Sequence, residues 1–215
     1  MAALTRFLVW TALLTGVAVG VLRLTALRWV RLPENDPVLE TSVLPTLEGG
    51  DLIVLWRLGR PSFGDLVLCP EPHVPERYVI GRIIAEGGDK VHLKEGKPFV
   101  NERQLIVDRR CDPPQFSFPH PDRPSEQVDQ QCGWEEMGSA LHMMGDPQIG
   151  KIVAEDRQYE VPDGHWFLLS DNRHFSYDSR DFGYIDASTC KELVLTRLVS
   201  RRGWTDAKRR ITYIQ

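Results

Sequence analysis

HWFLLSDNRHFSYDSRDFG, residues 165–183, joins a short apolar run to a run of polar and charged side chains. The apolar part, 165–169, has the length and composition of a buried strand. The part that follows, 170–183, is too polar for a core and offers many hydrogen-bonding groups. Loop positions beside a rigid strand are where binding and catalytic sites are usually built. The stretch therefore predicts a strand that ends at a functional loop.

Short apolar runs separated by Gly, Pro and Asn recur on both sides of this stretch. Many short strands with regular turn signals favour a mostly β, antiparallel architecture that is closed or folded over to hide its edges. The predicted strands are 51–56, 65–69, 78–84, 91–93, 99–100, 105–107, 151–153, 165–169, 182–185 and 193–199.

The segment 108–150 interrupts this rhythm. Five of its six prolines lie close together among Asp, Gln and Ser, which predicts an inserted, loop-rich subdomain. The β-rich catalytic domain is then expected over 34–107 and 151–200, with a basic, solvated tail over 201–215. The five prolines are Pro113, Pro114, Pro119, Pro121 and Pro124.

Composition and cysteine spacing limit the classes of function. The formal net charge of -4 gives no basic footprint for nucleic acid. No Cys-x-x-Cys pair and no His/Cys cluster at metal spacing occurs, so zinc is not expected. Cys111 and Cys132 could close a disulfide in an exported domain, whereas Cys69 lies in an apolar run and is predicted to be a core residue.

The N-terminal segment is predicted to be a membrane anchor. Residues 7–22 contain no charge, and the apolar character continues far enough to place a tilted single span over 5–30. A cleaved secretory signal and a buried core helix are the alternatives. Arg6 precedes the span, whereas Arg23, Arg28 and Arg31 follow it, so the positive-inside rule would keep the C-terminal domain in the cytoplasm.

Ser42 is the candidate nucleophile. It precedes Pro45-Thr46-Leu47 in what is predicted to be a constrained turn before a strand. A rigid turn holds a hydroxyl at a fixed angle to a substrate carbonyl, which lowers the entropic part of the barrier. A lone serine in a turn is usually only a local hydrogen-bonding group, so this candidate depends on the rest of the chain.

Three stretches taken together resemble the signature regions of type I signal peptidases: TSVLPTLEGGDLIV (41–54), RYVIGRIIAEGGDKV (77–91) and VPDGHWFLLSDNRHFSYDSRDFGYI (161–185). These are membrane-anchored serine endopeptidases that remove signal peptides from exported proteins. The resemblance implies a folded-over β catalytic domain without metal or cofactor. It also implies a single-pass protein of the bacterial inner membrane, with the catalytic domain on the exported side and with the lipid bilayer and precursor proteins bearing signal peptides as partners. This overrides the orientation inferred from charge.

The resemblance also assigns roles to individual positions. Ser42 matches the nucleophile, and Ser176 matches a serine that orients the catalytic base. Asp178 and Arg180 match a structural ion pair, and Arg82 matches the arginine that follows the base. Asp171, Asn172 and Arg173 match the start of the same signature.

Gly81 occupies the position of the family's general-base lysine. A buried lysine can accept the serine proton because desolvation lowers its pKa, whereas glycine has no side chain and Arg82 stays protonated. His174 is the predicted replacement base, with His165 and His73 as alternatives.

Two further positions depart from the family pattern. Glu40 stands where a serine assists the oxyanion site, and its carboxylate would repel an oxyanion unless it turned away or were neutralised. Ser170 replaces a glycine. Two hypotheses follow: an active signal-peptidase-type endopeptidase, and a catalytically inactive relative that binds signal peptides or a membrane partner.

Overall fold

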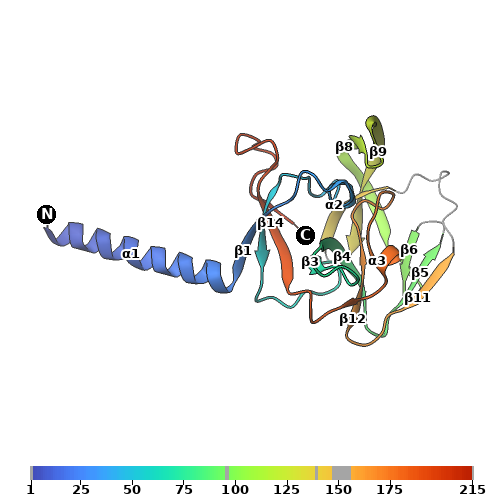
Figure 1. The fold of residues 1–215 in the computed structure, drawn as a ribbon, viewed down its shortest axis with the longest axis horizontal. Coiled ribbons are helices and arrows are strands. Elements are labelled where there is room, and N and C mark those ends of the chain that lie inside the picture. The colour runs from blue at the N-terminus through green and yellow to red at the C-terminus, as the bar shows by residue number, and fades with distance from the viewer. Residues whose placement is uncertain (1, 95–96, 139, 147–155, 215) are drawn as a thin grey trace.

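A long helix projects from a β-rich domain (Figure 1). The computed structural model describes residues 2–94, 97–138, 140–146 and 156–214. The predicted strand at 151–153 lies outside these residues.

The helix α1 (Ala2–Thr25) is long and apolar enough to cross a membrane. Its side chains are exposed, including Phe7 at 66% and Trp10 at 65%, so it is not the buried core helix of the alternative prediction. The predicted span of 5–30 extends too far, because the helix ends at Thr25 and the strand β1 (Leu27–Arg31) follows directly. Strand pairing with β2 takes these last residues out of the helix.

The main sheet is antiparallel and confirms the predicted fold class. Its order is β1, β2, β14, β3, β4, β12, β13, with β15 paired to β14. The bounds are β2 (Leu52–Trp56), β3 (Leu66–Pro70), β4 (Tyr78–Glu86), β12 (His165–Leu169), β13 (Ile185–Asp186), β14 (Glu192–Val199) and β15 (Thr212–Tyr213).

A second antiparallel sheet packs beside the first. Its order is β11, β5, β6, β7, and it shares a core with β4 and β12 through residues such as Ile84, Val91 and Phe167. The bounds are β5 (Lys90–Lys94), β6 (Lys97–Val100), β7 (Arg103–Gln104) and β11 (Arg157–Glu160).

The prediction of a loop-rich segment at 108–150 is wrong. The structure forms β8 (Ile106–His120), β9 (Arg123–Met137) and β10 (Ala140–Gly145), a three-stranded antiparallel sheet. Three of the prolines lie on β8, which is an edge strand, where a missing backbone N–H is tolerated. Pro113 and Pro114 lie within a register shift between Arg110 and Gln115, and Pro119 borders a second shift before His120.

Both pairs of cysteines are disulfide-bonded. Cys111 is joined to Cys132 across β8 and β9, as the sequence allowed. Cys69 is buried as predicted, but it is joined to Cys190, a pairing that the sequence did not reveal.

Two further elements differ from the predictions. Residues 182–185 are not one strand, because the short helix α3 (Ser179–Phe182) ends there and β13 begins at Ile185. The C-terminal tail is not simply solvated, since β15 pairs with β14 and Ile214 is buried in the core.

Candidate active site

Ser42 ends a short helix rather than lying in an open turn. The helix α2 (Pro37–Ser42) begins at Asp36, whose side chain accepts a hydrogen bond from the Leu39 N–H at 3.1 Å. Asp before Pro is a recognisable helix start, so this helix could have been predicted from the sequence. Ser42 is buried, and its Oγ donates to the carbonyl oxygen of Leu39 at 3.0 Å.

The chain after Ser42 is fixed to the loop that follows β12. The Asn172 N–H donates to the Ser42 carbonyl oxygen at 3.0 Å. Four residues later, the Thr46 hydroxyl donates to Asp171 Oδ2 at 2.6 Å. The structure therefore brings together the two polar stretches that the sequence separates by more than a hundred residues.

Arg82, on β4, also binds Asp171 and so joins a third segment of the chain to these two. Its guanidinium is fully buried and donates to both Asp171 oxygens, at 3.0 and 2.9 Å, and to the Gly64 carbonyl oxygen at 2.7 Å. Burial alone would raise the pKa of Asp171, but the charges of Arg82 and His142, together with hydrogen bonds from Arg82 and Thr46, hold that pKa below its usual value. The bidentate contact fixes three strands and the Ser42 turn relative to one another.

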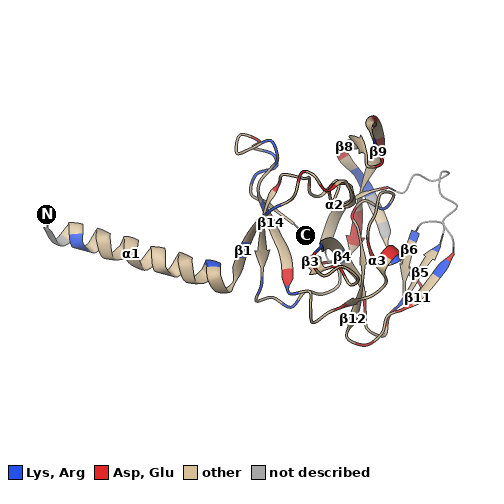
Figure 2. Cartoon of the chain, viewed as in Figure 1, with Lys and Arg blue, Asp and Glu red and all other residues tan. Residues whose placement is uncertain are grey.

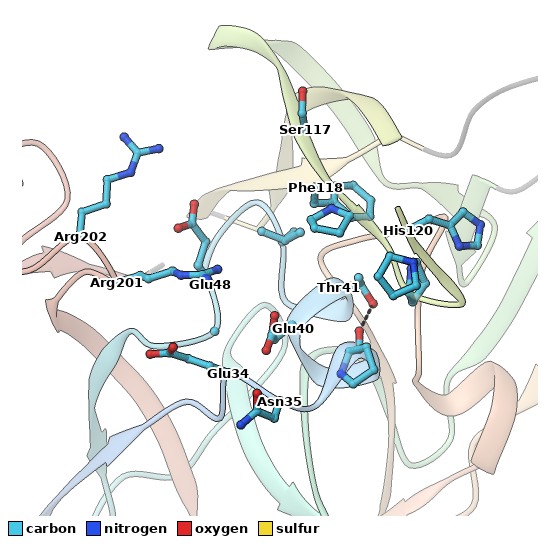
Figure 3. Close-up of a pocket in the computed structure, with 16 residues that line it drawn as sticks. Glu34, Asn35, Glu40, Thr41, Glu48, Ser117, Phe118, His120, Arg201 and Arg202 are labelled. Carbon is cyan, nitrogen blue, oxygen red and sulfur yellow. Dashed lines mark hydrogen bonds between the residues drawn. The ribbon is translucent and has the colours of Figure 1, made fainter. Parts of the chain in front are cut away.

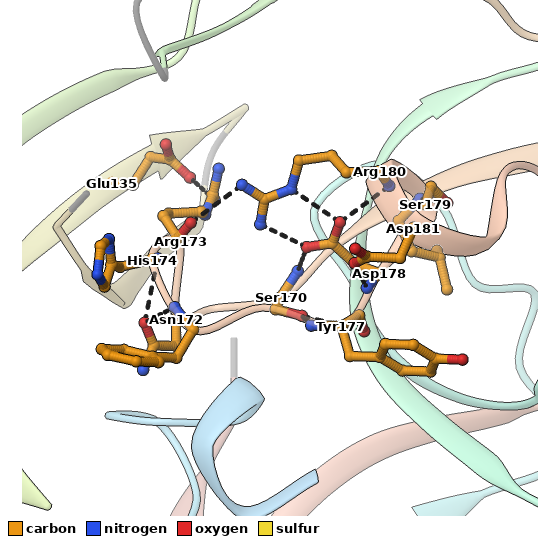
Figure 4. Close-up of polar contacts among 12 residues, drawn as sticks. Glu135, Ser170, Asn172, Arg173, His174, Tyr177, Asp178, Ser179, Arg180 and Asp181 are labelled. Atoms are coloured by element: carbon orange, nitrogen blue, oxygen red, sulfur yellow. Dashed lines mark hydrogen bonds and ion pairs between the residues drawn. The ribbon is translucent and has the colours of Figure 1, made fainter. Parts of the chain in front are cut away.

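Asp178 and Arg180 form the ion pair that the resemblance implies (Figure 4). Arg180 donates to the two Asp178 oxygens at 2.8 and 2.7 Å and to the Arg173 carbonyl oxygen at 3.0 Å. Asp178 also accepts from the Ser170 N–H at 2.8 Å. Burial opposes ionisation of Asp178, but Arg180 lowers its pKa below the usual value. Ser176 is half-buried in the same loop.

Gly81 lies in the middle of β4, opposite Val67 of β3. A Cβ atom added at Gly81 would lie 3.0 Å from the Leu168 Cβ and 3.5 Å from the Leu169 carbonyl oxygen. A side chain here would require β12 to move by a few tenths of an ångström. The space that a side chain at position 81 would need is thus filled by the close packing of β12 against β4.

A small cleft of about 10 Å³ adjoins Ser42. This volume holds about one water molecule. Its described lining contains neither Lys nor His and consists of Asp36, Val38, Leu39, Ser42, Arg77, Tyr78, Val79 and Tyr177.

The three candidate histidines lie elsewhere. The His174 ring packs edge-on against Phe175, with centroids 4.5 Å apart, and is not among the residues that line the cleft. His165 begins β12, at the end of the strand remote from Asn172, and its Nδ1 lies 3.0 Å from the Asp163 carbonyl oxygen. His73 is exposed in the loop between β3 and β4.

Beside this cleft, the N-terminal half of β4 has one edge without a strand partner among the described residues, although Val79 and Ile80 are themselves buried. β3 pairs with Tyr78 to Arg82, whereas β12 pairs only from Arg82 onward. Among the described residues, no strand covers the other edge of Tyr78, Val79 and Ile80. An extended peptide could add here as a strand.

Glu40 points away from Ser42, into a groove of about 740 Å³ on the other side of α2 (Figure 3). Its carboxylate faces this groove together with Glu34 and Glu48, and Arg201 also lines it. Burial raises the pKa of Glu40, which Arg201 partly offsets. The Glu40 carboxylate lies on the opposite face of α2 from Ser42, so it would not repel a negative charge that develops on a substrate oxygen at Ser42.

The third sheet supplies supporting residues that the sequence did not indicate. Gln130 donates to Asn172 Oδ1 at 2.9 Å, and Glu135 forms a buried ion pair with Arg173. His142 Nε2 lies 3.1 Å from Glu135. These side chains lie in the segment 108–150, which the sequence predicts to be rich in loops, so no strand periodicity singles them out.

Comparisons with known proteins agree with this geometry. The family described as "Signal peptidase, peptidase S26" matches residues 6–196. The chain is similar to a signal peptidase I from Pseudomonas aeruginosa, with 28% identity over 145 residues, covering 67% of this chain and 43% of the relative. It is also similar to thylakoidal processing peptidase 1, chloroplastic, from Arabidopsis thaliana, with 27% identity, covering 80% of this chain and 42% of the relative.

A solved signal peptidase I from Enterococcus faecalis aligns with 64% of this chain and 98% of its own, at 22% identity and a TM-score of 0.39. The chain spans less than half the length of the Pseudomonas aeruginosa and Arabidopsis relatives. Because the family match covers most of its residues, the chain belongs to the signal peptidase family.

Proposed function

We propose that this chain is a membrane-anchored serine endopeptidase that removes signal peptides from precursor proteins. The observation that carries the proposal is the attachment of the Ser42 turn to the final signature loop by Thr46, Asp171, Asn172 and Arg82. These contacts fix the backbone that follows the Ser42 hydroxyl, and a fixed orientation is what a nucleophile requires.

The open edge of β4 gives the proposed enzyme a place for its substrate. A precursor in extended form would pair with Tyr78, Val79 and Ile80, which brings its backbone to the cleft at Ser42. The cleft must widen for this, because about 10 Å³ does not admit a peptide group. The Ser42 hydroxyl must also leave the Leu39 carbonyl oxygen and pass its proton to a base, for which the described lining of the cleft offers neither Lys nor His. The Ser42 oxygen then attacks the scissile carbonyl carbon, the C–N bond breaks, and the amine leaves with that proton.

A second candidate function is precursor binding without cleavage. It is favoured by one feature, the absence of Lys and His from the described lining of the cleft, combined with glycine at position 81. Without an acceptor for its proton, a serine hydroxyl is a poor nucleophile. We propose no role as base for His174, since its ring packs on Phe175.

The two candidates are separated by incubating the purified full chain with a precursor that carries a cleavable signal peptide. Cleavage by the parent that is abolished in Ser42→Ala establishes the endopeptidase. Gly81→Lys restores the missing base, and we expect it to raise the cleavage rate by at least about a hundredfold. Gly81→Met is the matched control, because it adds similar bulk against Leu168 without an amine.

The outcomes are distinct. If only Gly81→Lys cleaves, the scaffold is competent and the natural chain binds without turnover. If neither the parent nor Gly81→Lys cleaves while both bind the precursor and remain folded, the endopeptidase proposal is wrong.

We further propose that α1 anchors the protein in a bacterial inner membrane, with the catalytic domain on the exported side. Two disulfides support the placement of the domain on the exported side of the membrane, because such bonds persist in oxidising compartments and are rare in the cytosol. They argue against the cytoplasmic placement that the arginines after the helix would favour.

A further inference from the structure

His142 lies at the centre of a buried group of charged side chains beside the candidate site. It is on β10, directly opposite Glu135 of β9, and it is 2% exposed. Its Nε2 lies 3.1 Å from Glu135 Oε2 and 3.9 Å from Asp171 Oδ1. The ring therefore stands between two carboxylates from different parts of the chain, the inserted sheet and the final signature loop.

Each of these carboxylates already has an arginine partner. Asp171 is paired with Arg82 of β4, and Glu135 is paired with Arg173 (Figure 4). Charged residues are spread over all three sheets and their loops (Figure 2), but these four side chains are buried. Buried charges need partners, and the two pairs balance one another's charge only as long as the imidazole between them is neutral.

The surroundings of the two ring nitrogens favour the neutral form of His142. A proton on Nε2 faces the carboxylates, whereas Nδ1 is buried and has no hydrogen-bond partner among the described residues. A second proton, on Nδ1, would leave a buried N–H without an acceptor and would add a third cation to the group. Burial and the charge of Arg82 accordingly lower the pKa of His142 below its ordinary value of 6.5, although Glu135 and Asp171 oppose this.

The strand that carries His142 is also bound to the site through its backbone. The Gly145 N–H donates to the Asp171 carbonyl oxygen at 2.8 Å. The Met143 carbonyl oxygen accepts from the Thr46 hydroxyl at 3.1 Å. Both residues that hold the turn after the candidate nucleophile, Thr46 and Asp171, are thus in contact with this strand.

We propose that His142, in its neutral form, is a positioning residue of the candidate site. The imidazole separates the Glu135 and Asp171 carboxylates and keeps Asp171 bound to Arg82 and Thr46. Protonation of the ring sets a third positive charge beside the two arginines and weakens the hold of Asp171 on the turn. This rests on the proposed function only in that the candidate site binds a precursor.

The site then depends on pH in a defined direction. The charged groups around the ring are Glu135 on β9, Asp171 and Arg173 in the loop after β12, and Arg82 on β4. Burial opposes ionisation of the two carboxylates, but their cationic neighbours hold the pKa of each below its ordinary value. Because the pKa of His142 is also lowered, the contacts are complete at neutral pH and are lost as the pH falls through that folded pKa.

The test uses the full, isotope-labelled chain in detergent micelles and follows two NMR signals as the pH is lowered. The His142 ring, assigned by its loss in His142→Gln, reports its own protonation. The Asn172 amide, which donates to the Ser42 carbonyl oxygen at 3.0 Å, reports the position of the turn. We expect both signals to change at one midpoint, below the ordinary 6.5. In His142→Gln, which keeps a neutral N–H donor at every pH, the Asn172 step at that midpoint should be absent.

Two further variants complete the comparison. His92 also contacts a carboxylate, that of Asp156, but it lies on β5 in the second sheet, so His92→Gln should leave the common midpoint unchanged. His142→Phe removes both ring nitrogens, so the Asn172 amide should be displaced already at neutral pH.

Precursor binding gives the functional readout. One pH unit below the midpoint about nine in ten His142 rings are protonated, so the dissociation constant of the parent for a precursor should rise about tenfold. His142→Gln should keep its affinity at that pH, because its side chain cannot take up the proton.

The outcomes are separate. An Asn172 amide that does not respond at the His142 midpoint, or that responds equally in His142→Gln, overturns the proposal. An undisturbed amide in folded His142→Phe overturns it as well, even where the ring stays neutral until the domain unfolds. A parent that binds no precursor at any pH contradicts the proposed function instead, and the two NMR signals still decide the role of His142.

Discussion

At the scale of single residues, two buried carboxylates organise the site. Asp171 holds Arg82 and Thr46, and Asp178 holds Arg180 and the Ser170 backbone. Each carboxylate is almost fully buried and ionised, so each depends on its arginine partner. Removing one partner from such a pair leaves an uncompensated charge, which costs more than the pair itself contributes.

Asp178→Asn tests this dependence through pH. The folded-state pKa of Asp178 lies below its ordinary value of 3.8, so its stabilisation is complete well above pH 4 and is lost as the pH falls through the folded pKa. At pH 7 we expect the variant to lose about 2–4 kcal/mol of unfolding free energy. Below about pH 4 the difference from the parent should shrink.

Denaturant unfolding at several pH values measures this difference. Asp163→Asn, at an exposed position, is the control and should change stability by less than about 0.5 kcal/mol throughout. A loss for Asp178→Asn that stays constant from pH 7 to pH 3 would contradict the assigned role.

At the scale of elements, the sheet of β8, β9 and β10 supports the loop that follows β12. Phe175 of this loop packs edge-on against Phe118 and His120 of β8, with ring centroids 5.3 Å away in both cases. Gln130 and Glu135 of β9 contact Asn172 and Arg173, the loop's first residues. The inserted sheet therefore restrains the same loop that holds the Ser42 turn.

Phe175→Ala should loosen the β8–β9 hairpin. The two aromatic contacts contribute about 1–3 kcal/mol together, so amide hydrogen exchange at 116–120 and 127–130 should become roughly tenfold faster or more. Tyr213→Ala, which removes an exposed ring from β15, is the control. Unchanged exchange in the hairpin would show that the backbone and polar contacts suffice to hold it.

At the scale of the whole molecule, the Cys69–Cys190 disulfide joins β3 to the segment that leads into β14. The two cysteines are separated by 121 positions, and both belong to the buried core cluster that also contains Ile83 and Trp166. A cross-link between such distant positions restricts the unfolded chain strongly. The fold is thus suited to an oxidising compartment.

Replacing Cys69 and Cys190 together by serine should lower the unfolding free energy by about 2–5 kcal/mol. Thermal unfolding of the parent with and without reductant provides the comparison. If the domain is exported as proposed, a membrane-impermeant maleimide reagent should label the parent in cells only after reduction, because its described cysteines are bonded. Labelling of unreduced parent would contradict the exported orientation.

Sequence alone determined the apolar helix, the positions of most strands and the residues of the signature loops, because these follow from local periodicity and turn chemistry. The sequence also singled out Ser42 as the candidate nucleophile and showed that position 81, where the resemblance places a general-base lysine, holds glycine. Only the tertiary structure decided that 106–137 and 140–145 form a sheet, that Cys69 pairs with Cys190 and that the His174 ring packs on Phe175. Those outcomes depend on contacts between residues far apart in the chain, which no local pattern encodes.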